Sequence, residues 1–376
     1  MKFYNLLFVS IFLFIIPFPF SAHAEITGIE SVSVSKNFFN PTLGENVQIA
    51  LKLSQSGQLS VAVIDRDGFL VRRLVSKKPV AATNLSLAWD GKTDAGEVVP
   101  NEAWNFKIDL ITDRGTDTYF PANAVQDPFE VKVNYYDRRS GIVAYELPQP
   151  CRVHMQAGSA SLNPKSKKME GPVLKTIVNR EPRTAGKVIE YWNGYDEGGT
   201  IYIPDVKNFV FAISLMPLSE NSVISVGNDS KTFVDSVATR TGESLFTFKT
   251  QDHKHHKGLT AMQDVAPVLT VQPMNGKWDQ KDNAWHVEDK NAELSVQLRG
   301  PSSQTFMQEP GIIFAFVDEE LVSKTRAPVK ELRLPIEKFS AGIHIVAINW
   351  ATEYGPTSVN SFRLKLSTTE VKTEQK

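Results

Sequence analysis

The feature that most constrains this chain is a hydrophobic alternation with a period of two. Apolar and polar residues alternate in the runs 47–53, 59–63 and 104–110. Successive side chains of a strand point to opposite faces of a sheet, so the pattern is typical of antiparallel strands with one buried face. Turn signals such as Ser56-Gly57 and Asp90-Gly91 separate the runs. Short alternating strands joined by tight turns predict an all-β chain of β-sandwiches.

The chain also contains an internal repeat. Segment 74–96 matches segment 177–199 at a constant offset of 103 residues, with Trp89 opposite Trp192. Beyond it, the alternating residues of 104–110 match those of 209–215 after an insertion of two residues. Matching segments of this length predict two sandwiches of the same topology in tandem, which meet near residue 134.

After the second copy the alternation is lost and then returns. The polar stretch 228–263 predicts a connector, and strand-like runs resume at Val268 and continue through 312–317 and 343–348. These runs predict a third all-β domain. The predicted divisions are a first sandwich at 25–133, a second at 134–227, the connector at 228–263, a third sandwich at 264–368 and a disordered tail at 369–376.

The N-terminus has the pattern of a secretory signal peptide. Met1-Lys2 precedes an apolar run over 3–20, and the small-residue site Ala22-His23-Ala24 follows it. An uncleaved anchor is the alternative, but Pro17 and Pro19 would break a spanning helix. No later run approaches the roughly 18 apolar residues that a spanning helix needs. We expect cleavage after residue 24 and export to the periplasm or cell surface of a bacterium.

Charge and cysteine content exclude several function classes. Lys plus Arg total 41 and Asp plus Glu total 42, a net charge of −1, which disfavours nucleic acid as a partner. Cys151 is the only cysteine, so the chain has no internal disulfide and depends on hydrophobic cores. Its strand-like setting predicts a buried structural thiol rather than a reactive one. The absence of a disulfide framework favours a bacterial envelope over a eukaryotic secretory route.

The segment 89–96, Trp-Asp-Gly-Lys-Thr-Asp-Ala-Gly, resembles the immunoglobulin-like (Ig-like) domain of flagellar hook-capping proteins and of many other exported bacterial proteins. The resemblance covers 38–112 well and 140–216 more weakly. It implies an Ig-like fold and says little about function, because the module serves as spacer, cap or adhesive unit in different proteins. The predicted signal peptide, tandem copy and third domain depart from hook-capping proteins, so we do not infer hook assembly.

The same motif has a physical interpretation. An Asp-Gly or Asn-Gly pair tolerates positive φ in a tight turn, and the preceding tryptophan can cover the open end of a sandwich. A calcium site on Asp90, Asp94 and Glu97, or on Asp65 and Asp67, is the alternative, but the spacing lacks the Asp-x-Asp-x-Asp-Gly pattern of a calcium loop. We therefore predict a structural motif in each copy, made by Trp89, Asp90, Gly91, Gly96, Trp192, Asn193, Gly194 and Gly199.

The strongest sequence signal for chemistry is His253-x-His255-His256. Alternate residues of an extended segment share a face, so these side chains can chelate Cu(II), Ni(II) or Zn(II). Lys254 and Lys257 would oppose a bound cation. A solvated basic loop, a docking segment and a pH-responsive contact are the alternatives.

Motifs for enzymes are scarce. The chain has no Gly-x-Ser-x-Gly elbow, no Gly-rich phosphate loop and no His-Glu-x-x-His, so we predict a protein that is not an enzyme and needs no cofactor. Tyr135, Tyr136, Trp278 and Trp285 can stack on sugars or belong to cores. The favoured hypothesis is an exported scaffold or protein-interaction module that binds other envelope or surface proteins. A metal-binding periplasmic protein and a carbohydrate-binding module are the alternatives.

Overall fold

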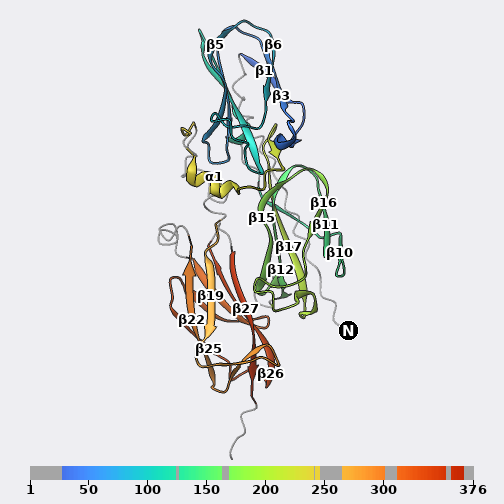
Figure 1. The fold of residues 1–376 in the computed structure, drawn as a ribbon, viewed down its shortest axis with the longest axis vertical. Coiled ribbons are helices and arrows are strands. Elements are labelled where there is room, and N and C mark those ends of the chain that lie inside the picture. The colour runs from blue at the N-terminus through green and yellow to red at the C-terminus, as the bar shows by residue number, and fades with distance from the viewer. Residues whose placement is uncertain are drawn as a thin grey trace, which may run out of the picture.

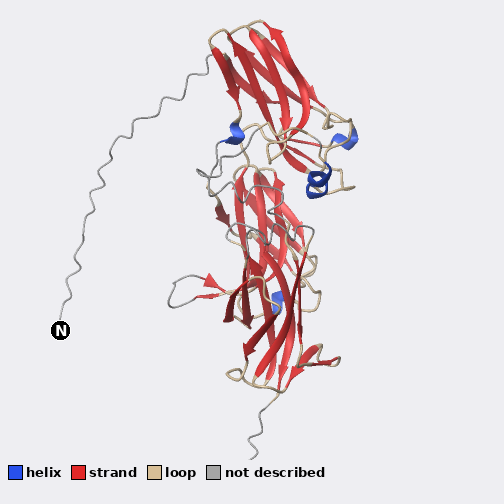
Figure 2. Cartoon of the chain, turned by 90° about the vertical axis from the view of Figure 1, so that its left-hand side faces the viewer, coloured by secondary structure: helices blue, strands red, loops and turns tan. Residues whose placement is uncertain are grey.

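Three β-sandwiches lie in a row along the long axis of the molecule (Figure 1). The computed structural model describes residues 28–123, 127–162, 169–240, 242–245, 265–300, 311–352 and 357–367. The predicted signal peptide and tail lie outside these ranges. Strands dominate the described residues, as Figure 2 shows, and the predicted all-β class of tandem sandwiches is confirmed. None of the helices in these ranges is long and apolar enough to cross a membrane.

The first sandwich has an Ig-like strand order. One sheet has the order β1-β3-β6, and the other β2-β18-β7-β4-β5, with β8 paired to β7. This arrangement places strands in the A, B and E positions opposite those in the C, F and G positions. Its elements are β1 (Ile29–Val34), β2 (Phe38–Phe39), the 3-10 helix η1 (Pro41–Leu43), β3 (Val47–Leu53), β4 (Gly57–Ile64), β5 (Leu70–Val80), β6 (Asn84–Trp89), β7 (Glu102–Thr112), β8 (Gly115–Tyr119), η2 (Pro121–Asn123), β18 (Val223–Ser225) and the helix α1 (Phe233–Thr239).

The second sandwich repeats this plan. Its sheets have the orders β10-β11-β16 and β15-β12-β17-β9, and β13 and β14 form a separate hairpin. Its elements are β9 (Phe129–Val131), β10 (Tyr135–Asp137), β11 (Ile142–Leu147), β12 (Cys151–Ser159), β13 (Ser161–Leu162), β14 (Met169–Glu170), β15 (Val173–Arg183), β16 (Gly186–Tyr191), η3 (Ile203–Asp205) and β17 (Phe209–Pro217).

The third sandwich pairs the small sheet β19-β22-β25 with the larger sheet β20-β21-β27-β26-β23-β24. The apolar run over 312–317 becomes β23, whose alternate residues face two different cores. Its strands are β19 (Val268–Pro273), β20 (Lys277–Asp279), β21 (Ala284–Val287), β22 (Asn291–Arg299), β23 (Ile312–Val317), β24 (Glu320–Arg326), β25 (Glu331–Pro335), β26 (Gly342–Ala351) and β27 (Thr357–Leu366).

The predicted internal repeat is confirmed in three dimensions. β5 and β15 are each 11 residues long and start 103 residues apart. At the same position in each strand the backbone has positive φ, 44° at Lys77 and 57° at Arg180. Non-glycine residues rarely adopt such angles, so their shared placement indicates a common irregularity of the two edge strands.

Three segments belong to a different sandwich from the one that the predicted divisions give them. β9 precedes residue 134, yet it pairs with β17 of the second sandwich. β18 follows the second sandwich in the chain, yet it lies between β2 and β7 of the first. The described part of the predicted connector also packs on the first sandwich, through Phe233 and Val237. Alternation identifies a strand but not the strand with which it pairs, so the sequence pattern could not assign these segments to a sandwich.

Candidate functional site in the joints between the sandwiches

The two copies of the repeat share the geometry of the turn that follows each buried tryptophan. The Trp89 indole Nε1 donates to the Lys92 carbonyl at 3.1 Å, and the Trp192 Nε1 donates to the Tyr195 carbonyl at 3.0 Å. Asp90 accepts from the Lys92 backbone N–H at 3.1 Å, as Asn193 does from that of Tyr195 at 3.0 Å. The two turns are thus built from the same hydrogen bonds.

Glycine is required in both turns. Gly91 and Gly194 have φ of 71° and 86°. A Cβ on Gly91 would lie 2.4 Å from the Pro41 Cβ, and one on Gly194 would lie 2.3 Å from the Tyr202 ring. Gly96 and Gly199 also have positive φ, 82° and 69°. These residues shape the loop ends of the sandwiches, and the joints are built beside those ends.

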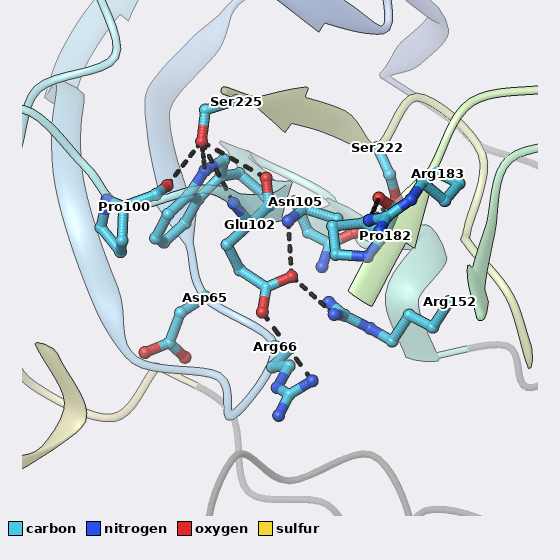
Figure 3. A network of polar contacts seen from close by, with 12 residues as sticks. Asp65, Arg66, Pro100, Glu102, Asn105, Arg152, Pro182, Arg183, Ser222 and Ser225 are labelled. Carbon is cyan, nitrogen blue, oxygen red and sulfur yellow. Dashed lines mark hydrogen bonds and ion pairs between the residues drawn. The ribbon is translucent and has the colours of Figure 1, made fainter. Parts of the chain in front are cut away.

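A buried cluster of charges joins the first sandwich to the second (Figure 3). The Glu102 carboxylate at the start of β7 accepts from the Arg152 guanidinium of β12 at 2.5 Å. Its other oxygen lies 3.8 Å from Nη1 of Arg66. The three side chains are only 4–6% exposed. Removing one partner from such a buried pair leaves an uncompensated charge, so this contact strongly favours one arrangement of the two sandwiches.

After the second sandwich the chain returns to the first, and we call residues 218–245 the returning segment. Ser225, in β18 of this segment, forms hydrogen bonds beside the charged cluster. Its hydroxyl accepts from the Trp104 indole N–H at 2.7 Å and donates to the Pro100 carbonyl at 2.7 Å (Figure 3). The residue is 1% exposed. Nearby, the hydroxyls of Ser219 and Ser222 both donate to the Asn105 side chain at 2.8 Å. Buried polar groups must be paired, so these serines fix the register of the returning segment.

Arg240, after α1, anchors the end of the returning segment. Its guanidinium donates to the carboxylates of Asp65 and Asp67 at 2.9 Å each and lies 3.6 Å from the ring centroid of Phe69. Burial raises the pKa of Asp65 to about 6. In the calcium alternative, Asp65 and Asp67 would have held a metal ion, whereas here a side-chain cation lies between them.

A cavity of about 590 Å³ lies between the returning segment and the first sandwich. Val99, Trp104 and Phe233 are among its apolar lining residues, and Glu97 and Lys231 are among its charged ones. Lys231 and Glu97 form an ion pair at 3.4 Å. The lining residues of the cavity all belong to the first sandwich or to the returning segment, so the cavity lies within the first sandwich rather than in a joint.

The contact between the second and third sandwiches, which we call the second joint, combines neutral hydrogen bonds with apolar packing. The Asn349 side chain accepts from the Val173 backbone N–H at 2.9 Å and donates to its carbonyl at 2.7 Å, as a neighbouring strand would. The Ser361 hydroxyl donates to the buried Asp196 carboxylate at 2.7 Å. Phe316 on the outer face of the third sandwich is part of the second sandwich's core cluster. The second and third sandwiches are therefore held along a shared face.

The predicted metal ligands His253, His255 and His256 lie outside the described residues, so copper, nickel or zinc binding there stays a prediction. Within the described ranges, no group of three or more His, Cys, Asp or Glu side chains is placed to hold a metal ion. Among the histidines that the structure describes, His154 has its pKa lowered by burial to about 4. The imidazole of His154, on β12, is therefore neutral at neutral pH.

The remaining predicted residues divide between core and surface. Cys151 is buried, and burial raises its thiol pKa to about 11, as expected of a structural cysteine. Tyr136 packs against Trp192, and Trp285 packs against the third core. Trp278 and Tyr135 are 48% and 57% exposed, on different sandwiches. Trp278 and Trp285 contact each other edge to face, with ring centroids 5.5 Å apart, whereas the two tyrosines lie on a different sandwich.

Sequence reasoning missed the residues that build the joints. Glu102, Arg152 and Asn349 occur within strand patterns as isolated polar residues. A signal did exist at Arg152, where a charged side chain follows a buried cysteine at the start of an apolar strand. Nothing in the sequence identified its partner, which lies 50 residues earlier.

Comparisons with known proteins assign this chain to no family. No family model matches the chain, and no curated protein matches it. Among solved structures, the fibronectin(III)-like modules of CbhA from Clostridium thermocellum are 9% identical, with a TM-score of 0.22, over 92% of this chain and 99% of that one. A tetra-tandem repeat of a large adhesion protein is 12% identical, with a TM-score of 0.20, over 90% and 74%. This chain is similar to tandem sandwich modules, and at these values the similarity assigns it no function.

Proposed function

We propose that this protein is a rigid, non-enzymatic spacer of a bacterial cell envelope, which holds partner proteins at a fixed separation. The observation that carries the proposal is the return of the chain from the second sandwich to the first, where β18 lies between β2 and β7. The chain therefore joins these two sandwiches twice, once before β9 of the second and once before β18 of the first, and a double connection restricts their relative motion more than a single linker does. Domains joined by a simple linker are expected to move relative to each other.

The two joints support the same conclusion by different means. The first excludes water from a charged cluster, and the second covers Phe316 and pairs Asn349 with a strand edge. Both would lose well-formed contacts if the angle between sandwiches changed. Export supports the envelope setting through the signal-peptide pattern of residues 1–24.

Spin labels on the first and third sandwiches test the proposal in the mature chain, residues 25–376. Electron-electron distance measurements between exposed positions such as Ser86 and Glu331 should give one narrow distribution. A matched variant, Glu102→Gln with Asn349→Ala, should broaden that distribution. A broad distribution in the unmodified chain would contradict a rigid spacer. Recovery of stoichiometric partners from cross-linked envelopes would test the scaffold role separately.

A further inference from the structure

One outer sheet face of the second sandwich is apolar and uncovered. The face belongs to the sheet β10-β11-β16, at the outer margin of the second sandwich in Figure 1. Tyr135, Ile189 and Tyr191 point outward and are 57%, 45% and 75% exposed. Sheet register places Tyr135, Ala144 and Ile189 in one row and Ile142 beside Tyr191 in the next. We call Tyr135, Ile142, Ile189 and Tyr191 the outer apolar face.

The first sandwich supplies an internal control for this face. The corresponding sheet, β1-β3-β6, has the same register, and the four matching positions are Ser33, Gln48, Ser86 and Ala88. All four are exposed, and the Ser86 hydroxyl donates to the Gln48 side chain at 3.1 Å. The fold therefore does not require large apolar residues here. The large apolar residues at these positions of the second copy therefore do not serve its own core.

The third sandwich shows what such a face does elsewhere in the chain. Phe314, Phe316, Ile345 and Ala347 lie on the outer face of its larger sheet, and all four pack against the core of the second sandwich. In this protein an apolar outer face is thus covered by another sandwich, whereas the bare face of the first copy is polar. By that comparison, the outer apolar face has the character of a surface that packs against another sheet.

We propose that the outer apolar face packs against the same face of a second copy of this chain, as a two-fold dimer. A two-fold contact needs only one patch, because the same surface serves both copies. The charges beside the patch allow it. Glu146 and Lys187 are directly opposite each other on neighbouring strands, and Asp137 lies opposite Ile142 at the end of the second row, so the border carries both signs, with two acids and one base.

The area predicts a weak dimer. At about 200 Å² for an aromatic side chain, the exposed parts of Tyr135 and Tyr191 amount to roughly 260 Å². A standard interface buries about 800 Å² on each partner, and the two rings supply only about a third of that area. We expect a dissociation constant on the order of 10–100 µM. A glycan is disfavoured because Ala144, Ile142 and Ile189 offer no side-chain hydrogen bonds to sugar hydroxyls between the two rings.

Sedimentation velocity of the mature chain from about 1 µM to about 1 mM tests the dimer. The test variant replaces the face by the residues of the first copy: Tyr135→Ser, Ile142→Gln, Ile189→Ser and Tyr191→Ala. These residues are tolerated at the same positions of the same fold. The control variant makes as many changes on the matching face, Ser33→Ala, Gln48→Ala, Ser86→Ala and Ala88→Ser.

The mature chain and the control variant should sediment increasingly as dimers as concentration rises, and the test variant should stay monomeric. The single change Tyr191→Ala, at a 75% exposed side chain, should weaken association at least fivefold without affecting folding. A mature chain that is monomeric throughout, or a test variant that dimerises as strongly, would overturn the proposal. The first of those outcomes would assign the face to a different protein or to a glycan.

Discussion

The first and second sandwiches share a turn, a strand order and a repeat offset, but they are completed in different ways. The first takes β18 from a segment beyond the second sandwich, and α1 packs Phe233 on its Trp104. The second takes β9 from the segment that precedes it. Related modules can therefore be linked more closely when a strand from beyond one module completes the sheet of the other. The two sandwiches therefore have the same turn and strand order, and they differ in which segments of the chain complete their sheets.

The largest expected effect comes from removing the returning segment. A chain of residues 25–217 lacks Val223, Ile224 and Phe233, which are 0%, 2% and 7% exposed. Burying each such side chain contributes about 1.5–3 kcal/mol, so the first sandwich should lose cooperative unfolding. A chain of residues 25–245 is the control and should keep it. Circular dichroism with urea distinguishes them, and equal stability would show that the borrowed strand is dispensable.

Glu102→Gln tests the charge that the two sandwiches share. The change leaves Arg66 and Arg152 buried beside a neutral amide, which should cost about 3–5 kcal/mol in the free energy of unfolding. Replacing Glu102 by Gln and Arg152 by Met together should cost less than Glu102→Gln alone. Urea denaturation of the three proteins measures this, and a loss of less than about 1 kcal/mol would exclude a structural role for the cluster.

The two sandwiches should respond to pH in opposite directions. The raised pKa of Asp65, about 6, adds stability to the first sandwich below pH 4 that is lost as pH rises to 6. The lowered pKa of His154, about 4, adds stability to the second above pH 6.5 that is lost as pH falls to 4. Each contribution is at most about 3 kcal/mol.

Asp65→Asn and His154→Gln separate these contributions. Relative to the unmodified chain, Asp65→Asn should be more favourable at pH 7 than at pH 4.5, and His154→Gln should be more favourable at pH 4.5 than at pH 7. Urea midpoints at both pH values provide the measurement. If the two variants shift in the same direction, the titrations are wrongly assigned.

The smallest effect is expected at the turns. Asp90 and Asn193 accept the same backbone hydrogen bond, so Asp90→Asn and Asn193→Asp should each change stability by less than about 0.5 kcal/mol. Thermal unfolding of both variants, with and without added calcium, measures this. A large loss in Asp90→Asn alone would mean that the carboxylate of the first copy has a role its counterpart lacks.

Local patterns in the sequence determined the modules. Alternation located β3 at its observed bounds, and the matched segments around Trp89 and Trp192 predicted turns that share their hydrogen bonds. Such patterns are informative because strand periodicity and turn chemistry act between residues that are close in sequence.

Only the tertiary structure decided which edges meet. β18 pairs with β7, Arg152 meets Glu102 and Asn349 pairs with Val173, across separations of 50 to more than 170 residues. A strand edge offers the same backbone groups whatever its sequence, and a buried charge can be matched by any opposite charge that the fold brings near. The sequence by itself therefore determined a chain of repeated β-sandwiches, and long-range packing decided how they were joined.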